Sequence, residues 1–312
     1  MIFLGKNHFD EIYLKLHPRL GSRIISQEPL ASHTSFGIGG PAVLFIYLHN
    51  IDELHFSVQI LKDCGCPIFV LGGGSNLLVS DRGFSGAVLK LDGDFSFVER
   101  QGLRVRVGAA TSLARTIKEV QGWGLDGLTF AVGIPGSVGG AIAVNAGAYG
   151  FSVGDRLVSA VVYHIERGTS SVVAREDFGF SYRKTILDRS SIILEALFEL
   201  EEGSPDGVQR KMDILASQRA RSQPLGLRTA GCVFKNPEGR FAGELIERAG
   251  CKGMSMGRTV VSDTHANFIV NRGGASADEV YRLIERVRER VYEKEAIFLE
   301  TEIVLLGEFG RG

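Results

Sequence analysis

An uncharged stretch of 28 residues, Gly127 to Gly154, constrains this chain more than any other segment. It lies between two aspartates and contains eight glycines. Its length would suit a membrane span, and Gly136 and Gly140 have the GxxxG spacing of packed membrane helices. However, Pro135, Asn145 and the many glycines leave too few large apolar side chains for a span. A buried pair of loops in an ordinary core is the plainest alternative.

The same stretch could instead surround a ligand. Glycine lets the main chain come within hydrogen-bond distance of a bulky ligand and adopt left-handed turns without steric cost. Successive N–H groups in such turns form concave anion sites. A second cluster, Gly72-Gly73-Gly74-Ser75-Asn76, follows an apolar run and has the same character. Two such loops make a phosphate-bearing ligand the leading hypothesis, although a tight hairpin turn would also explain a glycine run.

The composition is that of a globular protein large enough for two or three domains, with 312 residues, 44% hydrophobic and 23% charged. A net charge of −1 gives no support for binding to nucleic acid or to a membrane surface. Four scattered cysteines and seven single histidines indicate neither a disulfide framework nor a metal site. The N-terminal residues mix acidic and basic side chains, so we expect no signal peptide and a cytoplasmic protein with reduced thiols.

Hydrophobic periodicity predicts a chain in which helices and strands are mixed. The first 30 residues are expected to form a helix, with Phe9, Ile12, Leu14 and Leu16 among charged residues, and then a lead-in. Further helices are predicted at 51–61, 113–122, 208–221, 242–249 and 276–291, and strands at 43–48, 67–71, 103–107, 157–164, 171–174, 192–200 and 298–305.

Local signals mark where two of these helices begin. The polar stretch Glu201–Gly207 indicates a boundary, and Ser204 with Pro205 suits an N-cap and a first helical turn. Ser276 and Glu279 have the spacing of a capping box. Residues 208–312 therefore resemble a compact α/β unit that follows a larger α+β unit.

The glycine loops lack the best-known nucleotide motifs. The loop after Leu71 has neither the Lys-Ser/Thr ending of a P-loop nor the GxGxxG of a dinucleotide-binding Rossmann turn, which argues against a nucleoside triphosphatase and an ordinary Rossmann dehydrogenase. A third polar and glycine-rich segment, His33–Gly40, is weak alone, since a loop with a structurally satisfied histidine explains it equally well.

Six motifs taken together carry a family resemblance. They are HTSFGIGG, LGGGSNLLVSD, GIPGSVGGAIAVNAGAYG, FSYRKT, TAGCVFKNP and FLETEIVLLG, and they occur in this order over roughly residues 30–307. They resemble the UDP-N-acetylenolpyruvoylglucosamine reductases, also called UDP-N-acetylmuramate dehydrogenases, which are flavoenzymes of bacterial peptidoglycan synthesis. Only a few residues separate Arg183 from the strand expected at 192–200, so there is no room for the extra tyrosine-bearing loop of the longer class. The chain therefore resembles the shorter class of the family.

The resemblance implies an α+β fold with a defined order of domains. An N-terminal helix and lead-in would span 1–30. An FAD-binding domain of the vanillyl-alcohol-oxidase (PCMH) type, in two subdomains that divide near 95–105, would span 31–203. A C-terminal α/β substrate-binding domain would span 204–312.

It also implies an activity and its partners. FAD would be bound non-covalently, NADPH would be the hydride donor, and UDP-N-acetylglucosamine-enolpyruvate would be reduced to UDP-N-acetylmuramate for cell wall biogenesis, cell shape and cell division. We expect a cytoplasmic monomer with no metal, nucleic-acid or membrane partner.

The resemblance assigns residues to the cofactor and to the substrate. The residues expected to bind FAD are Ser35, Gly37, Gly39, Gly72, Gly73, Gly74, Ser75, Asn76, Gly133, Pro135, Gly136, Ser137, Gly139, Gly140, Asn145, Ala146 and Gly147. Those expected to contact the substrate are Tyr182, Arg219, Arg221, Lys235 and Asn236. For the two arginines, a basic helix end that interacts with the helix dipole is the alternative.

Three residues fall on the catalytic positions of the family. Arg183 would pair with the substrate carboxylate and the enolate, for which its planar fork is suited, and Glu302 would lie at the enolate. Their alternatives are a surface salt bridge and a solvated strand carboxylate. Cys232 occupies the position where the family commonly has a serine that gives a proton to C2. A thiol, with an ordinary pKa of about 8.5, can do this, but cysteine is also a frequent core residue.

Two rival functions stay open on the sequence alone. One is an FAD oxidase that shares the N-terminal fold, acts on an alcohol or sugar and uses oxygen. The other is a non-catalytic flavin- or nucleotide-binding module. The TAGCVFKNP and FLETEIVLLG motifs argue against the first, and the three catalytic positions argue against the second.

Overall fold

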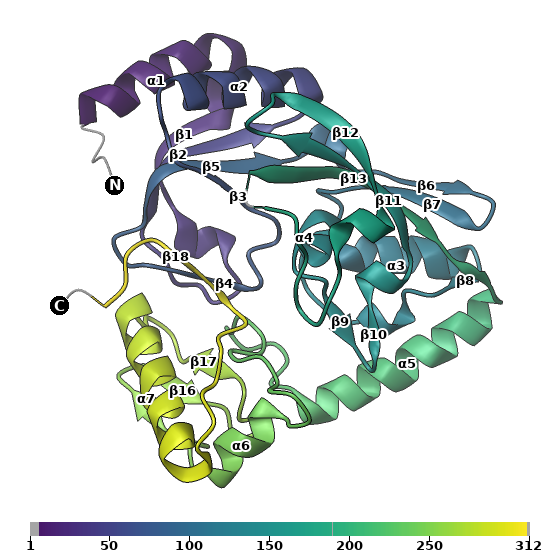
Figure 1. The fold of residues 1–312 in the computed structure, drawn as a ribbon, viewed down its shortest axis with the longest axis vertical. Coiled ribbons are helices and arrows are strands. Elements are labelled where there is room, and N and C mark those ends of the chain that lie inside the picture. Colours follow the sequence, from purple (N-terminus) through teal and green to yellow (C-terminus); the bar gives the residue numbers. More distant parts are fainter. Residues whose placement is uncertain (1–5, 189, 311–312) are drawn as a thin grey trace. The chain divides into compact units, whose positions relative to one another are not determined.

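The computed structural model describes residues 6–188 and 190–310 (Figure 1). By their contacts, the described residues form two compact units whose segments interleave along the sequence. Unit 1 takes the described residues of Met1–Ile25, Leu44–Gly73 and Gly86–Arg219, and unit 2 takes those of Ser26–Val43, Gly74–Ser85 and Ala220–Gly312. The domains expected from the sequence are consecutive ranges of residues, whereas these units each combine separate segments. The expected domain boundaries stay a prediction.

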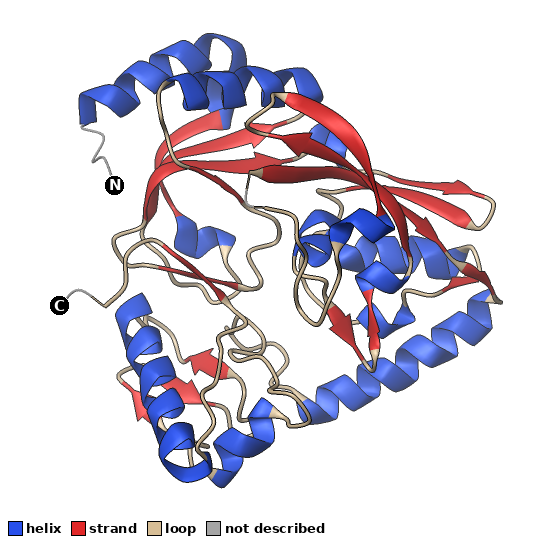
Figure 2. Cartoon of the chain, viewed as in Figure 1, coloured by secondary structure: helices blue, strands red, loops and turns tan. Residues whose placement is uncertain are grey.

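Helices and strands are mixed in both units, as predicted for an α+β chain (Figure 2). The helices are α1 Lys6–Leu20, α2 Ile51–Asp63, α3 Leu113–Gly122, α4 Val138–Ala143, α5 Pro205–Ser222, α6 Ala242–Arg248 and α7 Ala277–Glu295. Short 3₁₀ helices occupy Gly21–Arg23, Leu30–His33, Gly93–Phe95, Thr129–Ala131, Val153–Asp155 and Arg175–Phe178. Within the described residues, no helix is both long enough and apolar enough to cross a membrane.

The first helix confirms its prediction but not all of the residues expected on its apolar face. Phe9, Ile12 and Leu16 are buried at helical spacing. Leu14 is 69% exposed, because a residue two positions from Ile12 lies on the far side of a helix. The next helix, α2, begins where Asn50 Oδ1 accepts a hydrogen bond from Glu53 N at 3.0 Å.

Two sheets form most of the β-structure that involves unit 1. A four-stranded sheet has the order β1-β2-β5-β3. A five-stranded sheet has the order β12-β11-β13-β7-β6, and all neighbouring strands of this second sheet are antiparallel. The strands of the first sheet are β1 Ile24–Pro29, β2 Pro41–Leu48, β3 Ile68–Val70 and β5 Phe84–Leu91. Those of the second are β6 Val98–Gln101, β7 Arg104–Gly108, β11 Leu157–His164, β12 Thr169–Ala174 and β13 Ser191–Glu199. The strand predicted at 157–164 has the observed bounds.

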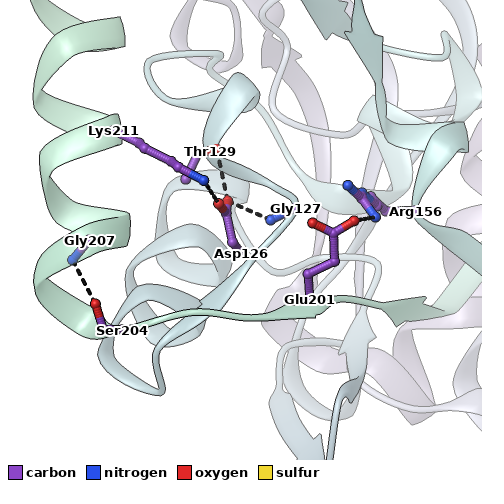
Figure 3. A network of polar contacts seen from close by, with 8 residues as sticks. All are labelled: Asp126, Gly127, Thr129, Arg156, Glu201, Ser204, Gly207 and Lys211. Carbon is purple, nitrogen blue, oxygen red and sulfur yellow. Dashed lines mark hydrogen bonds and ion pairs between the residues drawn. The ribbon is translucent and has the colours of Figure 1, made fainter.

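A network of polar contacts holds the start of helix α5 in unit 1 (Figure 3). Ser204 Oγ accepts a hydrogen bond from Gly207 N at 3.2 Å, which confirms the predicted N-cap. Asp126 accepts hydrogen bonds from Lys211 Nζ and from Thr129 Oγ1. Burial alone would raise the pKa of Asp126, but these donors outweigh burial and the pKa lies below its usual value. Asp126 itself belongs to the short strand β8 Leu125–Asp126, which pairs with β14 Glu201–Glu202.

Unit 2 is built around helix α7, which begins at the predicted capping box of Ser276 and Glu279. Asp81, far away in sequence, also accepts hydrogen bonds from Ala277 N at 2.8 Å and Asp278 N at 3.0 Å. The carboxylate thus satisfies two of the N–H groups that a helix start leaves without partners. The remaining strands of this unit are β4 Leu77–Val79, β15 Ser255–Met256, β16 Thr259–Val261, β17 Ile269–Asn271 and β18 Val304–Leu306.

The strand predicted at 298–305 is wrong in its extent. Only β18 is a strand, and it pairs in parallel with β4, with Val304 opposite Leu77. Before it, the chain makes a single bridge, between Thr301 and Phe234. Apart from that bridge, residues 298–303 have no strand partner among the described residues, so no continuous ladder forms before β18.

Candidate functional site

The glycine loops of unit 1 pack main chain against main chain. A methyl group on Gly73 would lie 2.5 Å from the Cα atom of Gly136, and one on Gly72 would lie 2.8 Å from Ser137 Oγ. Side chains are therefore excluded where the loop at 72–73 meets the loop at 133–140. Such a surface leaves peptide groups open to a ligand, which suits the diphosphate of a dinucleotide.

A lysine that no motif pointed to lies at one of these loops. Lys90, on β5, donates a hydrogen bond from Nζ to the carbonyl oxygen of Gly72. Burial lowers the pKa of Lys90, and the charge of Asp92 opposes that effect. A partly buried cation beside a glycine loop adds attraction for an anionic ligand. A single lysine in an apolar strand gives no sequence signal for this role.

The first glycine segment lies in unit 2 with the end of the second. Ser35 N donates to the carbonyl oxygen of Gly74 at 3.1 Å, and Ser35 Oγ donates to Thr229 O at 2.6 Å. The predicted cofactor residues of unit 2 are Ser35, Gly37, Gly39, Gly74, Ser75 and Asn76, and those of unit 1 are Gly72, Gly73 and all those from Gly133 onward.

Arg219 and Arg221, predicted as partners of the substrate diphosphate, have different surroundings. Arg219 is 7% exposed, and a methyl group on Gly133 would lie 2.9 Å from its Cδ atom. Arg221 is exposed. The structure therefore brings Arg219 to a loop expected to bind FAD, within unit 1, whereas Arg221 faces solvent.

Arg183 lies on a tight turn with a left-handed backbone. Ser181 and Lys184 exchange backbone hydrogen bonds of 3.0 and 3.1 Å across this turn, and Arg183 has φ +54°. Its Nη2 atom donates to the carbonyl oxygen of Gly147 at 2.7 Å, and its guanidinium lies 5.4 Å from the ring centre of Tyr182. The guanidinium is thus directed by a predicted FAD loop, while Tyr182 is 54% exposed beside it.

Asn145 connects the same loop to the Arg183 turn. Its Nδ2 atom donates to Ser181 O at 2.9 Å, and its Oδ1 atom accepts from Gly154 N at 3.1 Å. Asn145 is 5% exposed and has φ +45°. Its amide is therefore fixed at both ends by backbone groups.

Cys232 and Glu302 lie on neighbouring segments of unit 2. Glu302 N donates to Val233 O at 2.8 Å, and Lys235 N donates to Glu300 O at the same distance. Both Cys232 and Glu302 are half-buried. These backbone bonds place the two predicted catalytic residues on paired segments.

Two residues predicted to contact the substrate have other partners in unit 2. Lys235 Nζ forms an ion pair with Glu300 Oε1 at 2.7 Å. Asn236 Oδ1 accepts a hydrogen bond from Ala242 N at 2.9 Å, at the start of α6. A substrate contact by Lys235 would have to share its ammonium group with this carboxylate.

Two of the other three cysteines, Cys66 and Cys251, are buried, unlike Cys232. Burial raises the pKa of Cys66 to about 12 and also raises the pKa of Cys251. Cys64 is half-buried, as Cys232 is.

In the part of the chain that the structure describes, no three His, Cys, Asp or Glu residues lie close enough together to hold a metal ion.

A separate cavity of unit 1 contains none of the predicted site residues. It has a volume of about 460 Å³ and is lined by residues of α1, α2 and the β11–β12 hairpin, among them Arg19, His55, Phe56 and Tyr163. Since no residue of the glycine loops or of the Arg183 turn lines it, this cavity is not part of the candidate site.

Comparison with known proteins assigns both halves of the chain. A family model described as "FAD binding domain" matches residues 42–169, and one described as "UDP-N-acetylenolpyruvoylglucosamine reductase, C-terminal domain" matches residues 223–306. These matches confirm the expected fold, in which an FAD-binding domain precedes the C-terminal domain of this family.

Full-length relatives agree with the family models. The UDP-N-acetylenolpyruvoylglucosamine reductase of Bacillus subtilis (strain 168) is 38% identical over 300 residues, which cover 96% of this chain and 99% of the relative. That of Halalkalibacterium halodurans is 40% identical over 90% of this chain and 93% of its own. The crystal structure of the reductase from Thermus caldophilus matches with a TM-score of 0.79 and 36% identity, over 91% of this chain and 98% of that one. The chain therefore belongs to the UDP-N-acetylenolpyruvoylglucosamine reductase family.

Proposed function

We propose that this protein is an FAD- and NADPH-dependent oxidoreductase. It reduces the enolpyruvyl group of UDP-N-acetylglucosamine-enolpyruvate and gives UDP-N-acetylmuramate for peptidoglycan synthesis. The observation that carries the proposal is the presence in one chain of an FAD-binding domain and of this family's own C-terminal domain. We further propose that it acts in the cytoplasm, as a monomer.

The residues of unit 1 fit a non-covalently bound dinucleotide. Because a methyl group on Gly73 would clash with Gly136, only main-chain atoms lie where the two loops meet, and their peptide groups can contact a ligand. Lys90 adds a positive charge at Gly72. When bound, FAD supplies the redox chemistry, by taking a hydride from NADPH and delivering one to C3 of the enolpyruvyl group. The protein must orient the substrate, stabilise negative charge and provide a proton.

Arg183 would bind the substrate carboxylate and stabilise the charge that develops on the enolate. A guanidinium can form two parallel hydrogen bonds to a carboxylate, and a donor that is already oriented needs no reorganisation during the reaction. The bond from Nη2 to Gly147 O and the backbone of the turn support such an orientation.

Cys232 would hold the proton that is transferred to C2 of the substrate, and Glu302 would act at the enolate. A thiol is more acidic than the hydroxyl that the family commonly has at this position, so it is able to donate a proton. The backbone bonds of Val233 and Glu302 support fixed positions for both segments.

An FAD oxidase acting on an alcohol or sugar is the alternative function. The C-terminal match over 223–306 argues against it, because that domain is described for the reductase. Oxygen consumption with an alcohol or sugar substrate in the absence of NADPH would favour the oxidase.

The deciding experiment is an anaerobic stopped-flow measurement on the FAD-loaded protein. NADPH should bleach the flavin absorbance near 450 nm, a wavelength typical of oxidised flavins. Addition of the enolpyruvyl sugar nucleotide should then restore the absorbance and form the lactyl product. Reduction by NADPH without substrate-dependent reoxidation would reject the proposed reaction and leave a flavin-binding module.

A further inference from the structure

Each of the two long glycine loops contains an asparagine that bonds to the backbone at a proposed catalytic residue. In unit 1, Asn145 Nδ2 donates to Ser181 O, and Ser181 opens the turn that carries Arg183. In unit 2, Asn76 Nδ2 donates to Glu302 O at 3.2 Å, and Asn76 O accepts from Val304 N at 3.0 Å. The two asparagines thus make the same kind of contact, each within its own unit.

The loop of unit 1 contacts the Arg183 turn through a second bond, and three residues of the loop and the turn have a left-handed backbone. Asn145, Tyr149 and Arg183 all have positive φ, an unfavourable conformation for residues other than glycine that persists where the surroundings fix it. The loop at 145–147 holds the turn through the Asn145 amide and the guanidinium through Gly147 O. A displacement of this loop would therefore move Arg183 in both backbone and side chain.

An amide is the side chain that these contacts require. Asn145 donates to one backbone group and accepts from another, which a carboxylate of the same shape cannot do. Because Asn145 is 5% exposed, water cannot readily replace a lost bond. At Asn76, a carboxylate would place an acceptor against the Glu302 carbonyl oxygen.

We propose that Asn145 is a positioning residue for Arg183 and that Asn76 is a positioning residue for Glu302. This inference rests on the proposed catalytic roles of Arg183 and Glu302. Both asparagines belong to loops expected to contact FAD, so each would link the conformation of a cofactor loop to one group that acts on the substrate.

The test uses Asn145→Asp and Asn76→Asp in the FAD-loaded protein. Each should slow substrate-dependent reoxidation of the flavin about 10- to 100-fold, as expected for a misplaced catalytic group. Asn145→Asp should also weaken binding of the enolpyruvyl substrate, measured by its perturbation of the oxidised flavin spectrum. The decisive quantity is the rate of reoxidation divided by the rate of reduction by NADPH at saturating FAD, because a disturbed cofactor would slow both steps whereas a misplaced Arg183 or Glu302 should slow reoxidation more.

Double mutants separate positioning from a general loss of structure. In the Arg183→Ala background, Asn145→Asp should add less than about twofold, because the group it positions is already gone. In the Glu302→Gln background, the same change should keep its full effect. Asn76→Asp should show the reverse pattern, so the two crossed pairs are matched controls.

Asn145→Gly and Asn76→Ala provide second variants if an aspartate prevents folding. Glycine tolerates the backbone at Asn145 and removes only the amide. FAD affinity, from quenching of flavin fluorescence, and the melting temperature report on the cofactor and the fold. If the effects of Asn145→Asp and Arg183→Ala are additive, and those of Asn76→Asp and Glu302→Gln are too, at saturating FAD, the positioning roles are wrong. The proposed catalytic roles would then still stand. Unchanged reoxidation in Arg183→Ala or Glu302→Gln would instead overturn that residue's proposed role, and with it this part of the inference.

Discussion

The glycine loops of unit 1 exclude side chains where they meet, whereas the backbone of the Cys232 segment of unit 2 carries one. In the loops, main chain meets main chain, so that a methyl group on Gly73 would come within 2.5 Å of Gly136 Cα. The Cys232 segment is also held by its backbone, through bonds such as that from Val233 N to Asn267 O at 2.8 Å, but position 232 has room for a side chain. The side chain at position 232 takes no part in those bonds.

This difference explains why the glycine loops are recognisable in the sequence, whereas the backbone at position 232 does not restrict the residue type in the same way. Any residue larger than glycine would have to displace backbone at Gly73, so the packing restricts the residue type. At position 232, serine and cysteine can use the same backbone, so the chemistry alone restricts the choice. Substitutions in the glycine loops should therefore impair FAD binding, whereas substitutions at position 232 should slow the reaction.

Cys232→Ala should have the largest effect on rate. If the thiol gives the proton to C2, its loss should slow substrate-dependent reoxidation about a hundredfold to ten-thousandfold, the usual worth of general-acid catalysis. Flavin reduction by NADPH should continue, and Cys232→Ser should stay active if a serine hydroxyl can give the proton, as the family resemblance implies. Near wild-type turnover of Cys232→Ala, with normal solvent-proton incorporation at C2, would make Cys232 a packing residue.

Arg183→Ala should slow the same half-reaction by on the order of a hundredfold or more if Arg183 has its proposed role, since a donor to the developing charge would be lost. Reduction of the flavin by NADPH should be largely unchanged. Stopped-flow traces of the two half-reactions measure both rates in one protein. Equal slowing of both would mean that Arg183 supports the fold or the cofactor and not the substrate.

Gly73→Ala should weaken FAD binding by roughly 10- to 100-fold, because relieving such a clash costs on the order of 1–3 kcal/mol. Gly122→Ala is the matched control in the same unit, since a methyl group there has no neighbour within 4 Å. Fluorescence titration with FAD gives both affinities. Wild-type affinity in Gly73→Ala would show that the close packing of the loops is not needed for the cofactor.

Chemical labelling of the thiols should show a smaller, selective effect. Iodoacetamide at pH 8 should modify Cys232 and Cys64, which are half-buried, far faster than Cys66, whose pKa burial raises to about 12. Peptide mass spectrometry gives the rate at each site. The enolpyruvyl substrate should protect Cys232 and leave Cys64 reactive, and equal labelling of Cys232 with and without substrate would contradict its place in the site.

Asp126→Asn should have the smallest effect, a loss of about 1 kcal/mol in the free energy of unfolding at neutral pH. The pKa of folded Asp126 lies below its usual value of 3.8, so the charged form stabilises the fold above that pH. The stabilisation is lost as the pH falls through the folded pKa. Urea unfolding should therefore show the difference between wild type and variant shrinking below pH 3.8, and a constant difference would argue against the charged contact with Lys211.

Local sequence signals determined most of the secondary structure and the family. The capping box at Ser276, the N-cap at Ser204 and the strand at 157–164 are encoded by neighbouring residues, which is why the sequence predicted them. The glycine runs were informative for the same reason, since backbone contacts allow few other residues. They pointed to a flavoenzyme family that comparison then confirmed.

Only the tertiary structure decided which of these residues act on one another. The parallel pair of β4 and β18 joins residues 77–79 to 304–306, and the amides of Asn145 and Asn76 reach backbone groups far away in sequence. The contact of the Lys90 ammonium group with the carbonyl oxygen of Gly72 was equally absent from the local pattern. Such contacts depend on long-range packing, whereas periodicity and capping report only on residues within a few positions of one another.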